Sequence, residues 1–225
     1  MPLSPSWAPH ATAEELADVP VFPLPRIVFF PHTQLPLYLF EPRYRAMIED
    51  CLSRRSELIA VVQLAPGWEA SYEGQPDVRR VGGLGRIVAH ETRQDGTHDV
   101  LLQGLARVRL SELPLAKGGY RRARATVLED EAADRLSAED LATVYACASS
   151  VAGLVRRKHP SFELDATPDM GASRMLDLIA DRLIAHPETR QMILEAQGVQ
   201  ARSSSVLDAL SQLLLRLSAD RGAPS

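Results

Sequence analysis

The sequence predicts an α+β protein, in which a β-rich domain with one helix is followed by an all-helical domain. Up to about residue 129, apolar residues alternate with polar ones or form short β-branched runs, which is typical of strands. From about residue 130 they recur every three to four positions, which is typical of amphipathic helices. We therefore expect a flexible arm over residues 1–18, a β domain over 19–129, a helical bundle over 130–218 and a tail over 219–225.

The composition is globular and mildly acidic. Of the 225 residues, 45% are hydrophobic and 24% are charged, and the formal net charge is −4. Such a chain has no global positive field that would attract nucleic acid or anionic lipid. It has two cysteines, no apolar run as long as a membrane span, and no signal peptide at its N-terminus, so we expect a cytoplasmic protein.

The first elements of the β domain are short and rich in proline. Val21–Leu24 and Arg26–Pro31 are apolar runs punctuated by proline, which cannot donate to a β ladder, so we expect edge or bulged strands. Pro42 suits the first position of a helix, and an apolar stripe continues from it to Leu52. Glu57–Leu64 is expected to be a buried strand, followed by a long loop over residues 65–79.

A β-meander follows this loop. Val81–Arg93 and Thr97–Gly104 flank Asp95-Gly96, a strong signal for a two-residue hairpin turn. In that register His90 and His98 lie on opposite faces of the sheet and cannot share a metal ion. Two further half-buried strands are expected around residues 106–110 and 123–127.

The helical domain has clear start and stop signals. Ser137 and Asp140 have the spacing of a capping box, and the helix that follows ends in a basic cluster just before Pro160. Two shorter helices are expected over residues 173–185 and 188–197, and a last helix from about Ser204.

The sequence lacks the motifs of common catalysts. It has no phosphate-binding P-loop, no Gly-x-Ser-x-Gly motif, no Cys-x-x-Cys pair and no Ser-His-Asp arrangement. Lys117 and Lys158 are its only lysines, and both lie in contexts typical of solvated side chains, which argues against a Ser–Lys dyad. We expect no enzyme, no metal site and no cofactor.

Two sets of residues are candidates for binding. Arg107, Arg109, Arg122 and Arg124 alternate along two successive strands, and they share the outer sheet face if those strands pair in sequence. Such a stripe could bind an anion or RNA phosphates, or it could simply be a solvated face balanced by carboxylates. Trp68 and Tyr72 in the long loop could contact a peptide or could fold back against the core.

The stretch from Val19 to Leu52 contains several short motifs in a fixed order. Their residues, taken as determinants of the fold, are Phe22, Pro23, Leu24, Pro36, Phe40, Glu41, Pro42, Arg43 and Tyr44. This stretch resembles the opening of the Lon protease N-terminal, substrate-binding domain. The pieces Leu84-Gly85-Arg86 and Asp95-Gly96 also agree, whereas His32 stands where the family usually has glycine. The resemblance implies a PUA-like pseudo-barrel followed by a helical bundle.

The resemblance also implies a function. A free-standing domain of this kind, without the ATPase and peptidase modules of Lon, would bind unfolded or degron-like protein segments, with a separate protease or ATPase as a further partner. We expect apolar patches beside the cleft between the two domains to form the contact surface. The alternative is a PUA-like protein that binds RNA or another anion through the arginine stripe.

Overall fold

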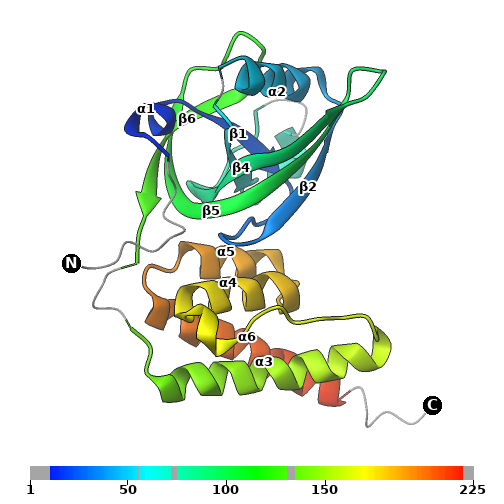
Figure 1. Ribbon diagram of the computed structural model, residues 1–225, viewed down its shortest axis with the longest axis vertical. Coiled ribbons are helices and arrows are strands. Elements are labelled where there is room, and N and C mark those ends of the chain that lie inside the picture. The colour runs from blue at the N-terminus through cyan, green and yellow to red at the C-terminus, as the bar shows by residue number, and fades with distance from the viewer. Residues whose placement is uncertain (1–10, 55, 72–74, 131–134, 220–225) are drawn as a thin grey trace. The chain divides into compact units, whose positions relative to one another are not determined.

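The computed structural model describes residues 11–54, 56–71, 75–130 and 135–219. The chain forms two compact units, residues 1–128 and 129–225 (Figure 1), and each is described here by itself. The first unit contains the strands and the second is helical, so the α+β class predicted from the hydrophobic period is confirmed.

The first unit is built on a mixed sheet that closes on itself. Its six strands are β1 (Val19–Leu24), β2 (Gln34–Leu39), β3 (Leu58–Gln63), β4 (Val81–Thr92), β5 (His98–Leu113) and β6 (Arg121–Leu128). Their order is β2-β5-β4-β3-β1-β6, and β5 also pairs with β6. Five strands therefore form a closed barrel, and β2 is added beside the N-terminal half of β5.

Alternate residues of the strands feed two separate cores. The barrel core takes side chains from all five closed strands, such as Val21, Ala60 and Leu110. The α2 core lies under helix α2 (Pro42–Arg54) and takes Met47 and Ile48 from it, together with Leu39 of β2. The strand β3 supplies both cores, which explains why it is buried on both faces.

A close backbone crossing joins these parts. The irregular segment before β2 passes directly over the glycines of β4 and β5. A Cβ atom added at Gly83 would lie 2.1 Å from the Phe29 carbonyl oxygen, and one added at Gly104 would lie 2.2 Å from that of Phe30. His32 N donates to Gly104 O at 2.9 Å, and Gly104 N donates to Thr33 O at 2.8 Å. Only glycine permits this approach.

The proline-rich start differs from the sequence prediction. The strand β1 is not an edge, because it pairs in parallel with β3 over Val21–Leu24 and antiparallel with β6 over Val19–Val21. Pro20 and Pro23 each have a paired neighbour on one side only, so the missing N–H can face the unpaired side.

The segment that follows also departs from expectation. The structure assigns no strand to Arg26–Pro31, whose side chains from Val28 to Phe30 are buried in the crossing, and it forms a strand at Gln34–Leu39 instead. His32 adopts φ 67°, the left-handed conformation for which glycine is the usual choice and which histidine tolerates better than bulkier residues.

The hairpin between β4 and β5 is one residue longer than predicted. Thr92 pairs with His98, and Arg93 N donates to Thr97 O at 2.9 Å, which leaves a three-residue loop over residues 94–96. Gly96 in this loop has φ 76°, and Asp95 Oδ1 accepts from Thr97 N at 3.0 Å. The predicted opposite placement of His90 and His98 is therefore wrong. Their rings lie on the same face, with centroids 5.7 Å apart.

The strands predicted at 97–104 and 106–110 are one strand. In β5, Leu105 bulges between Gly104 and Ala106, and the pairing with β4 resumes beyond it. A bulge bends a strand without ending it. This bend lets the N-terminal half of β5 pair with β2 and the C-terminal half pair with β6.

The predicted N-terminal arm has structure in its described part. Residues Ala13–Ala17 form helix α1, and Thr12 and Glu15 make a capping box at its start. Ala11 and Leu16 pack against the barrel core, and Asp18 forms an ion pair with Arg122 at 2.7 Å. Residues 11–18 are therefore part of the first unit rather than a loose extension.

The second unit contains helices α3 (Ala138–Lys158), α4 (Ala172–Leu183), α5 (Pro187–Glu195) and α6 (Val199–Ala219). The capping box predicted for Ser137 and Asp140 is confirmed, with Asp140 N donating to Ser137 Oγ at 3.0 Å. The last helix starts five residues earlier than Ser204, directly after Gly198, which has φ 86°. No helix among the described residues is both long and apolar enough to cross a membrane.

A buried arginine holds this unit together. The Arg202 side chain is fully buried, and its two terminal nitrogens contact the carboxylate of Asp130 at 2.6 and 2.5 Å. It also donates to Ser173 Oγ at 3.0 Å. The guanidinium thus ties the start of the unit to α4 and α6, and because it is buried, breaking its pair with Asp130 is costly.

We expect Gly104→Ala to destabilise the first unit by about 3 kcal/mol, because the new methyl group forces the Phe30 backbone away from β5. Urea unfolding followed by tryptophan fluorescence measures the effect, because Trp7 and Trp68 both belong to residues 1–128. Gly153→Ala is the control, since a Cβ there meets open space within α3. It should leave that transition unchanged, and equal effects of the two changes would contradict the crossing.

We expect Arg202→Met to destabilise the helical unit by about 3 kcal/mol, because it removes a buried guanidinium that pairs with Asp130 and donates to Ser173. Unfolding followed by circular dichroism at the helical signal measures the loss. The matched control is Arg182→Met, whose partner Asp165 is 59% exposed, and its cost should stay below about 0.5 kcal/mol. Similar values for both variants would show that burial does not govern the pair.

Candidate functional site

The strand β2 is apolar on both faces, although only one face packs against other described residues of the first unit. Leu35 and Leu37 pack against the α2 core, and Leu39 is buried within it. Pro36 and Tyr38 point to the other side and are exposed. The second edge of β2 has no partner strand among the described residues. An apolar, unpaired edge of this kind is a usual place for another chain to bind.

The exposed face of β2 continues across β5 and β4 as a shallow groove, which we call the β2 groove. Register places Pro36, Leu101 and Ala89 in one row across the three strands. The next row is Tyr38, Asp99 and Glu91. The hollow above them has a volume of about 500 Å³. It is therefore apolar along one row and acidic along the next.

The aromatic side chains at the end of the groove are held in place. The Arg93 guanidinium lies 5.0 Å from the centre of the Tyr38 ring, and Arg93 Nε donates to Asp99 Oδ2 at 2.5 Å. The Phe40 ring lies next to Tyr38, with centroids 5.8 Å apart. Tyr38 is 49% exposed and Phe40 is 60% exposed, which leaves two large aromatic faces in contact with water.

Most of the motif residues pack in the α2 core or stabilise the start of α2. The Phe22 ring meets the Tyr44 ring edge-on at 4.5 Å within the α2 core, and Leu24 and Pro23 are partly buried beside them. Pro42 begins α2, and Glu41 just before it pairs with Arg43 at 2.8 Å. Pro36 and Phe40 are instead exposed on the side of the β2 groove, so they do not pack in a core.

The four stripe arginines lie on one face, but they are not equivalent. The strands β5 and β6 pair so that Arg109 lies opposite Thr126 and Arg124 opposite Ser111. Arg107 is only 6% exposed, and Arg122 is paired with Asp18. Only Arg109 and Arg124 are exposed and without a carboxylate partner within the part of the chain that the structure describes.

Of the two aromatic candidates in the long loop, the structure describes only Trp68. Trp68 begins a short 3-10 helix, Trp68–Ser71, and is partly buried. Tyr72 lies outside the described residues. The pair therefore remains a prediction from the sequence.

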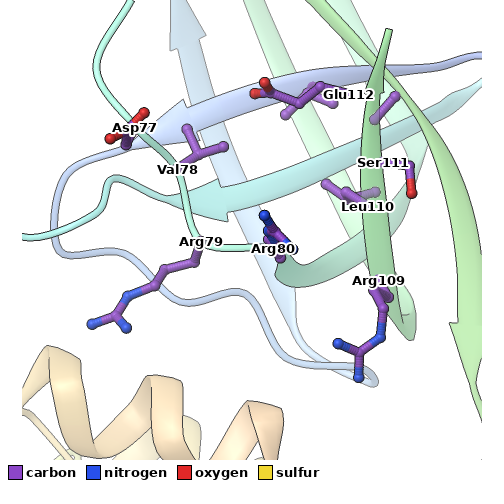
Figure 2. A pocket seen from close by; sticks show the side chains of 10 residues that line it. Asp77, Val78, Arg79, Arg80, Arg109, Leu110, Ser111 and Glu112 are labelled. Carbon is purple, nitrogen blue, oxygen red and sulfur yellow. The ribbon is translucent and has the colours of Figure 1, made fainter.

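A second hollow lies at one end of the barrel core (Figure 2). It has a volume of about 700 Å³, and its ten lining residues are Val21, Asp77, Val78, Arg79, Arg80, Arg109, Leu110, Ser111, Glu112 and Ala123. In Figure 2 the carboxylates of Asp77 and Glu112 lie on one side and the arginine side chains on the other. We call it the arginine cavity.

Three polar side chains on one face of the β4–β5 hairpin are linked by hydrogen bonds. The Thr92 hydroxyl contacts His90 Nε2 at 3.0 Å and His98 Nδ1 at 3.2 Å. His98 is 3% exposed, and its Nε2 is buried without a hydrogen-bond partner in the described structure. Burial lowers the pKa of His98, and the nearby His90 lowers it further.

The described residues form neither a metal site nor a reactive cysteine. No three histidine, cysteine, aspartate or glutamate side chains of the described residues are placed to hold a metal ion. Burial raises the pKa of Cys51 to about 12, so its thiol stays protonated at neutral pH and is a poor nucleophile.

Neither hollow was predicted from the sequence. The signal for the β2 groove was the unbroken apolar stretch Leu35–Phe40, in which both alternating faces are apolar. The arginine cavity had only the pair Arg79-Arg80 as a signal, because its third arginine comes from β5.

The geometry therefore defines a protein with a closed β barrel, a helical unit and an exposed apolar edge strand. The chain belongs to the ATP-dependent protease La (LON) substrate-binding domain family, whose model matches residues 18–212. This confirms the resemblance carried by the motifs at the start of the β domain.

Curated relatives are Lon proteases. The chain is 29% identical over 208 residues to the Lon protease of Anaeromyxobacter dehalogenans, with 87% of this chain and 23% of the relative covered. It is 30% identical over 202 residues to Lon protease 2 of Herpetosiphon aurantiacus, with 89% and 24% covered. The chain thus spans about a quarter of the length of these relatives.

Solved structures with the same fold are N-terminal domains of Lon. The Lon N-terminal domain protein of Xanthomonas campestris has a TM-score of 0.60 at 21% identity, covering 88% of this chain and 98% of that one. The N-terminal domain of the Mycobacterium avium complex Lon protease has a TM-score of 0.66 at 14% identity, covering 86% and 98%. At such identities the likeness establishes the fold.

We expect His98→Gln to flatten the pH dependence of stability between about pH 7 and about pH 5. The lowered pKa of His98 means that the folded protein takes up a proton less readily than the unfolded chain. Stability is therefore full above an unfolded-state pKa of about 6.5 and falls as the pH drops below it. Urea unfolding at several pH values measures the slope, and His186→Gln, an exposed histidine, should leave it unchanged.

Proposed function

We propose that the protein binds extended, apolar segments of other polypeptides in the β2 groove, without covalent chemistry. The observation that carries this proposal is the exposed apolar face of an edge strand, with Tyr38 and Phe40 at its end. Membership of a substrate-binding domain family supports the same function. Unfolded or degron-like segments are the natural occupants, because they expose apolar side chains in extended form.

Binding would use two kinds of contact. The free backbone edge of β2 can pair with an added strand, which supplies hydrogen bonds that do not depend on sequence. Apolar side chains of the added segment would cover Pro36 and Tyr38, and covering part of an aromatic ring that is already half-buried contributes roughly 1 kcal/mol. The cation–π contact of Arg93 holds the Tyr38 ring in place before binding, which reduces the entropy lost on binding.

The acidic row of the β2 groove would favour bound segments that carry a basic residue. Glu91 is exposed, and Asp99 already has Arg93 as its cation. A bound segment with a lysine or arginine beside its apolar residues would place that cation near Glu91. A basic residue next to an apolar run is therefore the favoured segment, and weaker binding in high salt should follow.

A separate protease or ATPase is the further partner that this function would serve. The bound segment would have to reach that partner unfolded, and shallow binding in an open groove allows its release. We propose the cytoplasm as the location of this role.

The alternative, RNA binding through the arginine stripe, has less support. Arg107 is buried and Arg122 is occupied by Asp18, so two of the four predicted phosphate contacts are not open. Two exposed arginines provide little affinity for a nucleic acid, and the net charge of −4 opposes it.

We expect the double substitution Tyr38→Ser with Phe40→Ser to weaken binding of an unfolded client about 30-fold, because two aromatic contacts of roughly 1 kcal/mol each are lost. The client can be a fluorescently labelled, reduced and carboxymethylated α-lactalbumin, with anisotropy as the measurement.

Met192→Ser is the matched control, since Met192 is 63% exposed on α5 and lies in the other unit. It should bind the client like the unaltered protein. If the control loses as much affinity as the double variant, or if the unaltered protein binds no client at about 50 μM, the β2 groove is not the binding surface.

A further inference from the structure

The direction of the backbone hydrogen bonds along β2 is fixed by its pairing with β5. In an antiparallel pair, successive residues point their N–H and C=O groups alternately to one neighbouring strand and to the other. Gly104 N donates to Thr33 O at 2.8 Å, so Thr33 points its backbone groups toward β5. The same alternation, continued along β2, points the backbone groups of Leu35, Leu37 and Leu39 toward β5.

The hairpin at the other end of β5 gives the same direction. Arg93 N donates to Thr97 O at 2.9 Å, so Thr97 points its carbonyl group toward β4. The next residue, His98, therefore points its backbone groups toward β2, where its register partner is Leu39. Both hydrogen bonds thus assign the same residues of β2 to the pairing with β5.

The open edge of β2 is therefore formed by Gln34, Pro36 and Tyr38. The strand β2 is last in the strand order, and no strand that the structure describes pairs with it on this side (Figure 1). The carbonyl oxygens of these residues point outward, but only Gln34 and Tyr38 add an N–H, because proline has none. Pro36 thus provides an acceptor without a donor at the centre of the edge.

This pattern disfavours a second copy of the chain as the occupant of the edge. If the β2 strands of two molecules paired about a two-fold axis, each Pro36 would leave the carbonyl opposite it without a donor. That loss occurs twice in a dimer, but only once with a segment that has an N–H at every position. A strand of 6 residues is also only about 20 Å long, whereas a stable interface between folded proteins buries about 800 Å² on each side.

In a segment added antiparallel to β2, the residues that bond to the open edge also face the β2 groove. Residues directly opposite each other in an antiparallel pair point their side chains to the same face of the sheet. Pro36 and Tyr38 line the groove. The residues opposite them therefore cover the groove with their side chains and donate their N–H groups to the edge. The residues between them point their N–H groups away from β2.

We propose that the β2 groove selects extended segments with alternating apolar side chains, in which every residue at an apolar position carries a backbone N–H. Proline is excluded from the apolar positions and tolerated at the positions between them. The requirement rests on the proposed function, since it applies only to segments bound in the β2 groove. A lysine at the end of such a segment complements the charge of the exposed Glu91 in the acidic row.

The test is the binding of N-methylated peptides to the full chain, measured by fluorescence anisotropy. The parent peptide is labelled Lys-Val-Thr-Val-Thr-Val-Lys, in which the valines take the apolar positions. N-methylation of the central valine removes an N–H that bonds to the edge, and it should weaken binding at least about tenfold. The matched control is N-methylation of the following threonine, whose N–H points away from β2. It should change the affinity by less than about twofold.

A substitution in β2 locates the pairing. Pro36→Val adds the missing N–H at the centre of the open edge and leaves the ladder with β5 intact, so the parent peptide should bind about fivefold more tightly. Pro114→Val is the matched control, since this exposed proline follows β5 in the same unit. It should bind the peptide like the unaltered protein, and far-UV circular dichroism checks that both variants fold.

The results distinguish the backbone requirement from the proposed function. Equal losses for the two N-methylated peptides, or no gain of affinity in Pro36→Val, would overturn the requirement and leave the groove as a binding surface. The requirement also fails if the parent peptide does not bind at about 50 μM while the unfolded client does. If neither binds, the proposed function itself is wrong. A dimer of the unaltered chain that the parent peptide dissociates in sedimentation would assign the edge to a second copy instead.

Discussion

The β unit depends on the contact between the backbone of Phe29 and Phe30 and the glycines of β4 and β5. The segment passes so close to Gly83 and Gly104 that its carbonyl oxygens occupy the space of the absent Cβ atoms. The same crossing places the Phe29 ring in the α2 core and, through Thr33 and Gly104, starts the pairing of β2 with β5. The exposed edge strand therefore exists because glycine leaves room for the segment before it.

Local features were predictable because their causes are local. The helix at Pro42, the capping box at Ser137 and the change of hydrophobic period near residue 130 depend on residues within one or two turns of the chain. The error in the hairpin was also local, but it concerned loop length, which the Asp-Gly signal does not specify alone. One additional residue in the loop at Asp95-Gly96 reversed the relative faces of His90 and His98.

The candidate binding surfaces show a contrast between local patterns and distant partners. The alternation of the arginines along β5 and β6 correctly gave their shared face, but Asp18, which occupies Arg122, lies more than a hundred positions away. The arginine cavity needed the pairing of Val81 with Arg109, which local patterns do not specify. The β2 groove was visible in principle, because Leu35–Phe40 is apolar at every position. Recognising it required knowing that one face of β2 does not pack against any described element of the first unit.

The glycine crossing also has a consequence for how such chains can diverge. Its requirement is the absence of a side chain at a few positions, together with general apolar character in two cores, and neither demands particular residues elsewhere. Most of the surface is then free to drift while the backbone keeps its path. Solved Lon N-terminal domains that share 14% and 21% of their residues with this chain still follow the same fold. A new binding specificity can therefore evolve on β2 without risk to the barrel.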